Sequence, residues 1–318
     1  VDESSPLPKL RVCPGMLVSA RVSLLGVIFA RAAAFAPPLP THVRSPLPSR
    51  AISANPSLQP SATRRFYTTP TSVRMAAERQ ITVEDVLASP KWPDKWPFSP
   101  SDFKRMDESD DEIFYDTPRL VYHIDEGAVA ALTEYYAKEI KPKSDLLDIC
   151  SSWVSHYPAD FTSTMGRRVG LGMNGAELKE NKQLTETVVQ NLNLNSKMPF
   201  EDNSFDVVTC VVSVDYLIKP LEVFKEVQRV LRPGGKFIVS QSNRCFATKA
   251  IQIWLNTNDL EHVFIIGSYF HYAGGFKPPV AIDISPSKKE GKKDASPIAA
   301  LFGAAMGDPM IIIQSEKA

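Results

Sequence analysis

The strongest constraint on the fold is a strand–helix–strand pattern in the second half of the chain. Residues 206–214 are apolar at most positions and rich in valine, which is typical of a strand buried on both faces of a sheet. Residues 220–231 predict a helix, because Pro220 suits a first turn and apolar residues recur on one face. Gly234–Gly235 ends that helix, and residues 236–240 are apolar again. The pattern predicts two parallel strands joined by a crossover helix.

The same alternation extends over most of the chain. Further strands are predicted at residues 146–150, 169–172, 280–284 and 310–314, and further helices at residues 125–140, 176–184 and 247–255. Strands that alternate with helices indicate the α/β class, with a doubly wound, mostly parallel sheet. Ligands of such sheets bind at the carboxyl ends of the strands. The candidate site therefore comprises the segments that follow Ile149, Gly172, Ser213 and Ser240.

The charge of the chain divides into two unlike parts. Over 318 residues, 36 basic and 36 acidic residues give a formal net charge of zero, which does not support nucleic-acid binding through a basic surface. Residues 1–77 contain nine basic residues, two acidic residues and 11 of the 26 prolines, so residues 78–318 carry a formal charge of −7. We expect a disordered targeting leader at 1–77, an aromatic arm at 78–118 and a folded domain at 119–318.

The predicted leader has the composition of a targeting sequence. An apolar stretch at residues 22–30 is too short to span a membrane, and small residues follow it at 31–37, as in a signal peptide. The rest of the leader is rich in Ser, Thr, Pro and Arg and has no acidic residue. This order resembles the two-part plastid presequence of algae with complex plastids. Two alternatives are a mitochondrial presequence, suggested by residues 64–67, and a leader without function.

Neither the arm nor the cysteines indicate a metal site. The arm contains several aromatic residues, and prolines at residues 90, 93, 97 and 100 argue against long regular elements in it, so we expect its aromatic side chains to pack on the main domain. Its acidic run at residues 107–112 is interpreted as a solvated face. The four cysteines do not form a CxxC pair, and His, Cys and Asp are not clustered at ligand spacing, so we expect no metal.

Two stretches carry a family resemblance. Residues 198–206 (MPFEDNSFD) and 226–236 (EVQRVLRPGGK) are separated by the predicted strand and amphipathic helix. This arrangement resembles class I S-adenosylmethionine-dependent methyltransferases of the type 11 group. The segments CSSWVSH, SVDY, SNRCF and YFHYAGGF are similar to an uncharacterised plant and algal branch of that group. The resemblance implies a seven-stranded, Rossmann-like methyltransferase fold for residues 119–318, S-adenosylmethionine as cofactor and a small-molecule methyl acceptor.

The cofactor motifs depart from the family pattern. The acid that ends the first strand is present as Asp148, but the three glycine positions after it hold Cys150, Ser152 and Val154. Val154 is β-branched and would resist positive φ, so we expect the loop to take a different path, with serine hydroxyls replacing backbone donors. Gly172 stands where the family has an acid for the ribose hydroxyls.

Several residues near Gly172 could replace the missing acid. Asn174 and Glu177 follow it closely, and Asn191 replaces the acid that contacts the adenine amino group. An amide oxygen can still accept a hydrogen bond there. The cofactor-binding residues that the resemblance implies are Asp148, Cys150, Ser151, Ser152, Gly172, Met173, Asn174, Asn191, Leu192 and Ser213.

Candidate catalytic and substrate groups flank the same strand ends. Methyl transfer depends mostly on alignment, and a general base assists when the acceptor is a hydroxyl or a carbon acid. The catalytic candidates are His156, Asp215 and His271. The substrate candidates are His123, Trp153, Tyr216, Asn243 and Arg244, and Arg119 and Tyr122 could cap the cofactor's methionine end. The alternative is a non-catalytic binding or regulatory protein that keeps the methyltransferase fold.

Overall fold

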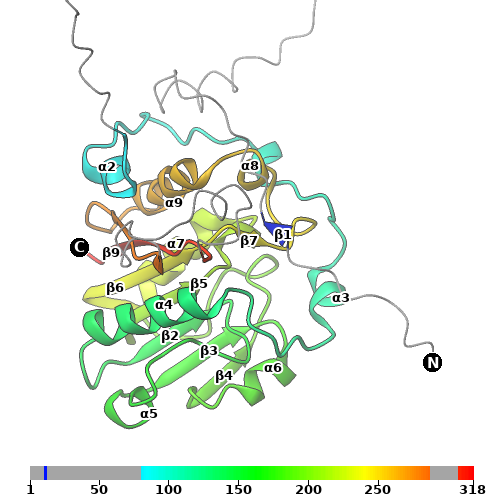
Figure 1. Cartoon of the computed structure of the whole chain (residues 1–318), viewed down its shortest axis with the longest axis vertical. Helices are drawn as coiled ribbons and strands as arrows, with labels where there is room; N and C mark the ends of the chain where they lie inside the picture. Colours follow the sequence, from blue (N-terminus) through cyan, green and yellow to red (C-terminus); the bar gives the residue numbers. More distant parts are fainter. Residues whose placement is uncertain (1–10, 13–79, 287–306) are drawn as a thin grey trace, which may run out of the picture. The chain divides into compact units, whose positions relative to one another are not determined.

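The computed structural model describes residues 11–12, 80–286 and 307–318, and within them a seven-stranded sheet forms the centre (Figure 1). The sheet order is β4-β3-β2-β5-β6-β9-β8, and only β9 runs against its neighbours. The strands are β2 (Leu146–Ile149), β3 (Arg168–Gly172), β4 (Glu186–Val189), β5 (Phe205–Val211), β6 (Leu231–Gln241), β8 (Val280–Asp283) and β9 (Ile311–Glu316). The α/β class and the mostly parallel sheet agree with the sequence-based prediction.

The strand order places the topological switch point of the sheet between β2 and β5. The chain builds β3 and β4 on one side of β2 and then crosses to β5 and β6 on the other side. Loops after the strands therefore diverge at this point, and a crevice opens at the carboxyl ends.

One face of the sheet is covered by α4 (Glu126–Glu139). Asp125 caps this helix by accepting a hydrogen bond from the Ala128 amide at 2.8 Å, as its sequence predicts. Leu132 and Tyr136 of α4 pack in a buried cluster with residues of β2, β5, β6 and β9. The short helix α5 (Phe161–Thr164) adds Phe161 to the same cluster.

The opposite face is covered by α7 (Pro220–Val230) and α9 (Asp259–Ala273). Phe224 of α7 is fully buried, and its ring lies 4.9 Å from the ring of Phe237 on β6. It also lies 5.5 Å from Tyr269 and 4.9 Å from Phe270, both on α9. This aromatic cluster holds both helices on the sheet.

The aromatic arm packs against α9. Its helix α2 (Val83–Ala88) contacts α9 and β8, beside which it lies in Figure 1. Trp92 stacks on His271 at 5.1 Å, and Trp96 lies 5.4 Å from Tyr272. The arm continues through a 3₁₀ helix (Pro100–Phe103) and α3 (Asp111–Tyr115). In the structure this segment continues to the start of α4, and from here on the arm denotes residues 80–124.

The remaining elements are short. They are α6 (Gly175–Glu180), a 3₁₀ helix (Val214–Tyr216), β7 (Arg244–Cys245), α8 (Gln252–Leu255) and β1 (Arg11–Val12), which pairs with β7. Apart from β1, the predicted leader lies outside the described residues. No helix among the described residues is long and apolar enough to cross a membrane.

Among the elements that the sequence analysis did not predict are β4 and α9, and one predicted helix was placed wrongly. β4 is an edge strand whose residues are mostly exposed, so the apolar signal of a buried strand is absent. α9 is buried around most of its circumference, so its sequence lacks an amphipathic pattern. The helix predicted at residues 247–255 is limited to α8, because residues 246–251 form turns around the buried Lys249.

We predict that Phe224→Ala lowers the free energy of unfolding by about 3–5 kcal/mol, because it leaves a cavity among three aromatic neighbours. Urea denaturation followed by circular dichroism measures this change. Lys225→Ala is the matched control on the exposed side of α7 and should change stability by no more than about 0.5 kcal/mol. Equal stabilities of the two variants would contradict this packing.

Candidate functional site

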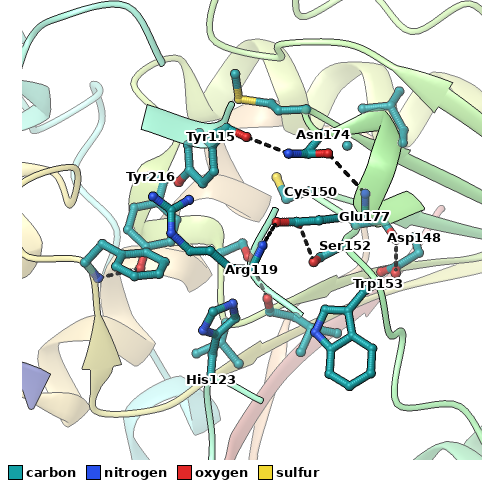
Figure 2. Close-up of a pocket in the computed structure, with 18 of the residues that line it drawn as sticks. Tyr115, Arg119, His123, Asp148, Cys150, Ser152, Trp153, Asn174, Glu177 and Tyr216 are labelled. Carbon is teal, nitrogen blue, oxygen red and sulfur yellow. Dashed lines mark hydrogen bonds between the residues drawn. The ribbon is translucent and has the colours of Figure 1, made fainter. Parts of the chain in front are cut away.

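A pocket lies at the carboxyl ends of β2, β3 and β5, where the strand pattern predicted a site (Figure 2). The loops after these strands line one side of it, and the arm before α4 lines another. Among the sequence-predicted residues, those that line the pocket are Arg119, His123, Asp148, Cys150, Ser151, Ser152, Trp153, His156, Gly172, Met173, Asn174, Glu177, Asn191, Leu192, Ser213, Tyr216 and Arg244. Tyr122, Asp215, Asn243 and His271 do not line it.

The carboxylate of Asp148 fixes the loop that follows β2. Its Oδ2 accepts hydrogen bonds from the hydroxyls of Ser151 and Ser155, both at 2.7 Å. Its Oδ1 accepts a third hydrogen bond from the hydroxyl of Thr209 on β5, at 3.0 Å. Asp148 is buried, and burial raises its pKa from 3.8 to about 6, although the three hydroxyls act in the opposite direction. The loop is thereby tied to two strands through one side chain.

The loop takes a different path from that of a glycine-rich turn. Of the three expected glycine positions, only Cys150 has a left-handed backbone, with φ of 55°, whereas Ser152 and Val154 do not. Left-handed residues also occur at His156, with φ of 56°, and at Val212, with φ of 45°. A β-branched residue is disfavoured there, so Val212 marks backbone strain beside the pocket.

Gly172 has no side chain because the loop occupies the space beside it. A Cβ atom at this position would lie 2.0 Å from the carbonyl oxygen of Ser151. The loop is fixed at this close approach, since the Ser151 amide donates to the carbonyl of Leu171 at 2.9 Å. An acid at the end of β3 is therefore incompatible with this loop. The missing glycines after β2 and the missing acid after β3 thus have one structural cause.

Asn174 is not a free acceptor for ribose hydroxyls, contrary to one sequence-based expectation. Its Oδ1 caps α6 by accepting hydrogen bonds from the amides of Ala176 and Glu177, at 2.8 and 3.1 Å. Its Nδ2 donates to the carbonyls of Tyr115 and Asp116 in the arm, at 2.8 and 3.0 Å. The side chain thus joins the helix start to the arm.

Glu177 lies at the centre of the site (Figure 2). The residue is 8% exposed, and one carboxylate oxygen, Oε2, accepts a hydrogen bond from the hydroxyl of Ser152 at 2.6 Å. The other oxygen, Oε1, accepts one from the amide of Arg119 at 2.7 Å. The arm is therefore also attached to α6 and to the loop after β2.

The segment that the resemblance assigns to adenine binding, residues 191–193, also forms a hydrogen bond to the arm. Leu192 is buried and lines the pocket, and Asn191 lies beside it. Asn193 donates to Asp111 at 3.0 Å and to the carbonyl of Tyr216 at 2.9 Å. Its amide oxygen accepts a hydrogen bond from the backbone of Ile218 at 2.9 Å, so the side chain joins this segment to the arm and to the 3₁₀ helix after β5.

The arm contributes pocket residues that the sequence analysis missed. Asp111 is 4% exposed and forms an ion pair with Arg105 at 2.5 Å, so the interpretation of residues 107–112 as a solvated face is wrong at this residue, whereas residues 108–110 and 112 are exposed. Lys249 is fully buried, with its Nζ 3.3 Å from the same carboxylate. Buried carboxylates require such partners, and the acidic run gave no sign of which residue is turned inward. Tyr115 and Phe246 complete this side of the pocket.

Three histidines proposed from sequence have different surroundings. His123 and His156 line the pocket, and each has a buried Nδ1 without a hydrogen-bond partner. Burial lowers the pKa of His123 below 6.5, and it lowers the pKa of His156 to about 4, so both rings are neutral near pH 7. His271 stacks on Trp92 of the arm, outside the pocket, and its placement does not fit the predicted catalytic role.

Of the candidate residues that follow β5 and β6, some line the pocket and others do not. Asp215 is 2% exposed and has an oxygen, Oδ2, without a hydrogen-bond partner, but it is not among the residues that line the pocket. Tyr216 lines the pocket, and its hydroxyl accepts a hydrogen bond from the Phe246 amide at 2.7 Å. Arg244 lines it too, paired with Asp308 at 2.8 Å. Within the described residues, groups of His, Cys, Asp and Glu able to hold a metal are absent.

Comparisons with known proteins point to methyltransferases. Residues 154–239 match the family model described as a methyltransferase domain. A demethylmenaquinone methyltransferase of Bacillus cereus is 33% identical over 114 residues, which are 33% of this chain and 48% of that protein. A sterol 4-C-methyltransferase of Caenorhabditis elegans is 58% identical over 43 residues, which are 14% of this chain and 13% of that protein. The chain thus spans less than half the length of these relatives.

A solved structure shows a similar but distant match. Phosphoethanolamine N-methyltransferase 2 of Haemonchus contortus, in complex with S-adenosyl-L-methionine, is 17% identical with a TM-score of 0.41, covering 60% of this chain and 52% of that one. The family match and the relatives show that the part of the chain around residues 154–239 is similar to methyltransferase domains, and the seven-stranded sheet is compatible with that similarity. The family match begins at Val154, so the altered loop at 148–153 lies outside it.

We predict that Gly172→Ala destabilises the protein by about 1–3 kcal/mol, because its Cβ would overlap the backbone of Ser151. Thermal and urea unfolding measure this loss. Gly175→Ala is the matched control: it lies at the start of α6, where the nearest neighbour, a methyl group of Val189, is 3.2 Å away. A Gly172→Ala variant as stable as the control would show that the loop does not lie against β3.

Asp215 should make stability depend on pH. Burial raises its pKa from 3.8 to about 8, so between these values the folded state holds a proton that the unfolded state has lost. Stability should therefore fall as pH rises through this range, by at most about 1.4 kcal/mol per pH unit. Asp215→Asn removes this titration, so the variant's unfolding free energy should fall less, whereas exposed Asp160→Asn should follow wild type. Parallel curves for wild type and Asp215→Asn would refute this assignment.

Proposed function

We propose that the protein is an S-adenosylmethionine-dependent methyltransferase that acts on a small molecule. The observation that carries this proposal is the pocket at the carboxyl ends of β2, β3 and β5, within a domain that matches a methyltransferase family model. The strand order places this pocket at the switch point of the sheet, which is where α/β proteins bind nucleotide-like ligands.

The residues present fit the cofactor, although not in the family's usual arrangement. Asp148 holds the loop after β2, and Leu192 offers an apolar surface for adenine, with Asn191 beside it. Ser213 and Cys150 line the strand ends between them. When bound, S-adenosylmethionine supplies an electrophilic methyl group on a sulfonium, and the protein's contribution is alignment and exclusion of water.

The walls formed by the arm support a small acceptor. Tyr115, Arg119 and His123 line the pocket together with Tyr216 and Phe246. The Phe246 ring lies 5.4 Å from the His123 ring and 5.5 Å from the Arg119 guanidinium, so these side chains are adjacent. Hydrogen bonds from the arm to α6, to Trp153 and to Asn193 hold it over the strand ends. An acceptor that enters beneath this arm has to be small. His123 is neutral near pH 7, so its ring can take a proton from an acceptor hydroxyl.

A second candidate function is a non-catalytic protein that keeps the fold. The filled space beside Gly172 favours this candidate, because it removes the family's acceptor for the ribose hydroxyls. The two candidates differ in one measurable property, which is affinity for S-adenosylmethionine or S-adenosylhomocysteine.

The proposed destination of the protein is a plastid, with the mitochondrion as the alternative. This proposal rests on the composition of residues 1–77 alone. Import of a fluorescent fusion of these residues into isolated plastids and mitochondria would distinguish the two.

We predict that S-adenosylhomocysteine raises the melting temperature of the full chain and binds in a calorimetric titration. Asp148→Ala should abolish binding, because the loop after β2 loses the carboxylate that holds Ser151 and Ser155. Asp160→Ala, an exposed aspartate at the start of α5, is the control and should bind like wild type. If wild type shows neither effect at saturating ligand, the methyltransferase proposal is wrong and the second candidate stands.

A further inference from the structure

The end of β3 cannot provide the acid that methyltransferases of this class use for the ribose hydroxyls. The carbonyl oxygen of Ser151 lies 2.0 Å from where a Cβ of residue 172 would stand, and its carbonyl carbon lies at 3.0 Å. Backbone cannot move aside there, because Ser151 is held to Leu171 and to Asp148. A ribose bound at this strand end needs another acceptor.

Three carboxylates line the pocket among the described residues, and two of them already have three polar partners each. Asp148 accepts three hydroxyl hydrogen bonds. Asp111 is paired with Arg105 and Lys249 and accepts a hydrogen bond from Asn193. The third is Glu177, which accepts one hydrogen bond on each oxygen, and both donors are uncharged.

Glu177 therefore keeps acceptor capacity directed into the pocket. An ionised carboxylate can accept about four hydrogen bonds, so about two remain after Ser152 and Arg119. Its side chain is buried, and no ion pair to it is found within the described chain. A buried anion of this kind is stabilised by further donors, and two adjacent hydroxyl groups provide them without bringing a charge.

The local structure also orients Glu177. Asn174 caps α6 and fixes the helix start, and Ser152 lies opposite on the loop after β2. Figure 2 shows the carboxylate between Ser152 and the backbone of Arg119, on the pocket side of α6. Asn174 cannot take this role itself, because both ends of its amide are already bonded.

We propose that Glu177 is the residue that binds the two ribose hydroxyls of the cofactor, from helix α6 instead of from the end of β3. This inference rests on the proposed function, since it assigns a recognition residue for the same cofactor. The loop after β2 has moved into the space of the strand-end acid, and the acid that replaces it lies five residues later on the chain.

Calorimetric titration of the full chain with two ligands tests this assignment. One ligand is S-adenosylhomocysteine, and the other is its analogue without the 2′ and 3′ hydroxyls. Glu177→Gln should weaken binding of S-adenosylhomocysteine about 10- to 100-fold, as expected for loss of hydrogen bonds to a charged group. It should leave the affinity for the dideoxy analogue unchanged.

Two control variants keep the result interpretable. Glu180 is exposed on the same helix, so Glu180→Gln should not change the affinity for either ligand. Ser152→Ala removes one existing partner of Glu177 but keeps the carboxylate, so it should still discriminate between the two ligands. Circular dichroism and the melting temperature verify that each variant folds. If Glu177→Gln does not fold, Glu177→Asp replaces it, and this variant should reduce the difference in affinity between the two ligands.

The outcomes separate this inference from the proposed function. If Glu177→Gln loses affinity for both ligands equally, the residue only supports the loop and the arm. This result would overturn the assignment. Unchanged affinity for both ligands would overturn it as well. If wild type binds neither ligand, both the proposed function and this inference are wrong.

Discussion

The buried carboxylate of Asp148 is the interaction on which the pocket depends. Its three hydroxyl partners come from the loop after β2 and from β5, so one side chain joins the two strands that flank the switch point. A carboxylate without these partners would be costly to bury, and burial still raises its pKa to about 6. The loop path that follows from this anchoring explains why Gly172 lacks a side chain.

The arm completes the site through hydrogen bonds to residues in and beside the altered cofactor motifs. Asn174, Glu177, Trp153 and Asn193 each bond to the arm. Most of these contacts involve arm backbone, so they depend on its path more than on its side chains. The pocket is consequently shared between an α/β sheet and a segment that precedes it in sequence.

Much of the fold was predictable because the pattern of strands 146–150, 169–172, 206–214 and 236–240 is strong. Apolar runs on buried strands and the amphipathic helix α7 are local signals. β4 and α9 were not predicted, since an exposed edge strand and a helix buried on nearly all sides give no periodic signal. The position of His271 outside the pocket was not predictable for a related reason: an aromatic-rich segment does not reveal which of its residues face a pocket.

The sequence by itself determined the α/β class, the carboxyl-end location of the site and the absence of the usual glycines and strand-end acid. Only the tertiary structure decided that these two absences are linked, because the contact of the Ser151 backbone with Gly172 joins segments about 20 residues apart. It also decided that Asp111 is buried and that Asn174 is occupied, while Glu177 retains unused acceptor sites. Hydrogen-bond partners and close approaches depend on which segments meet in space, and composition and periodicity do not specify that.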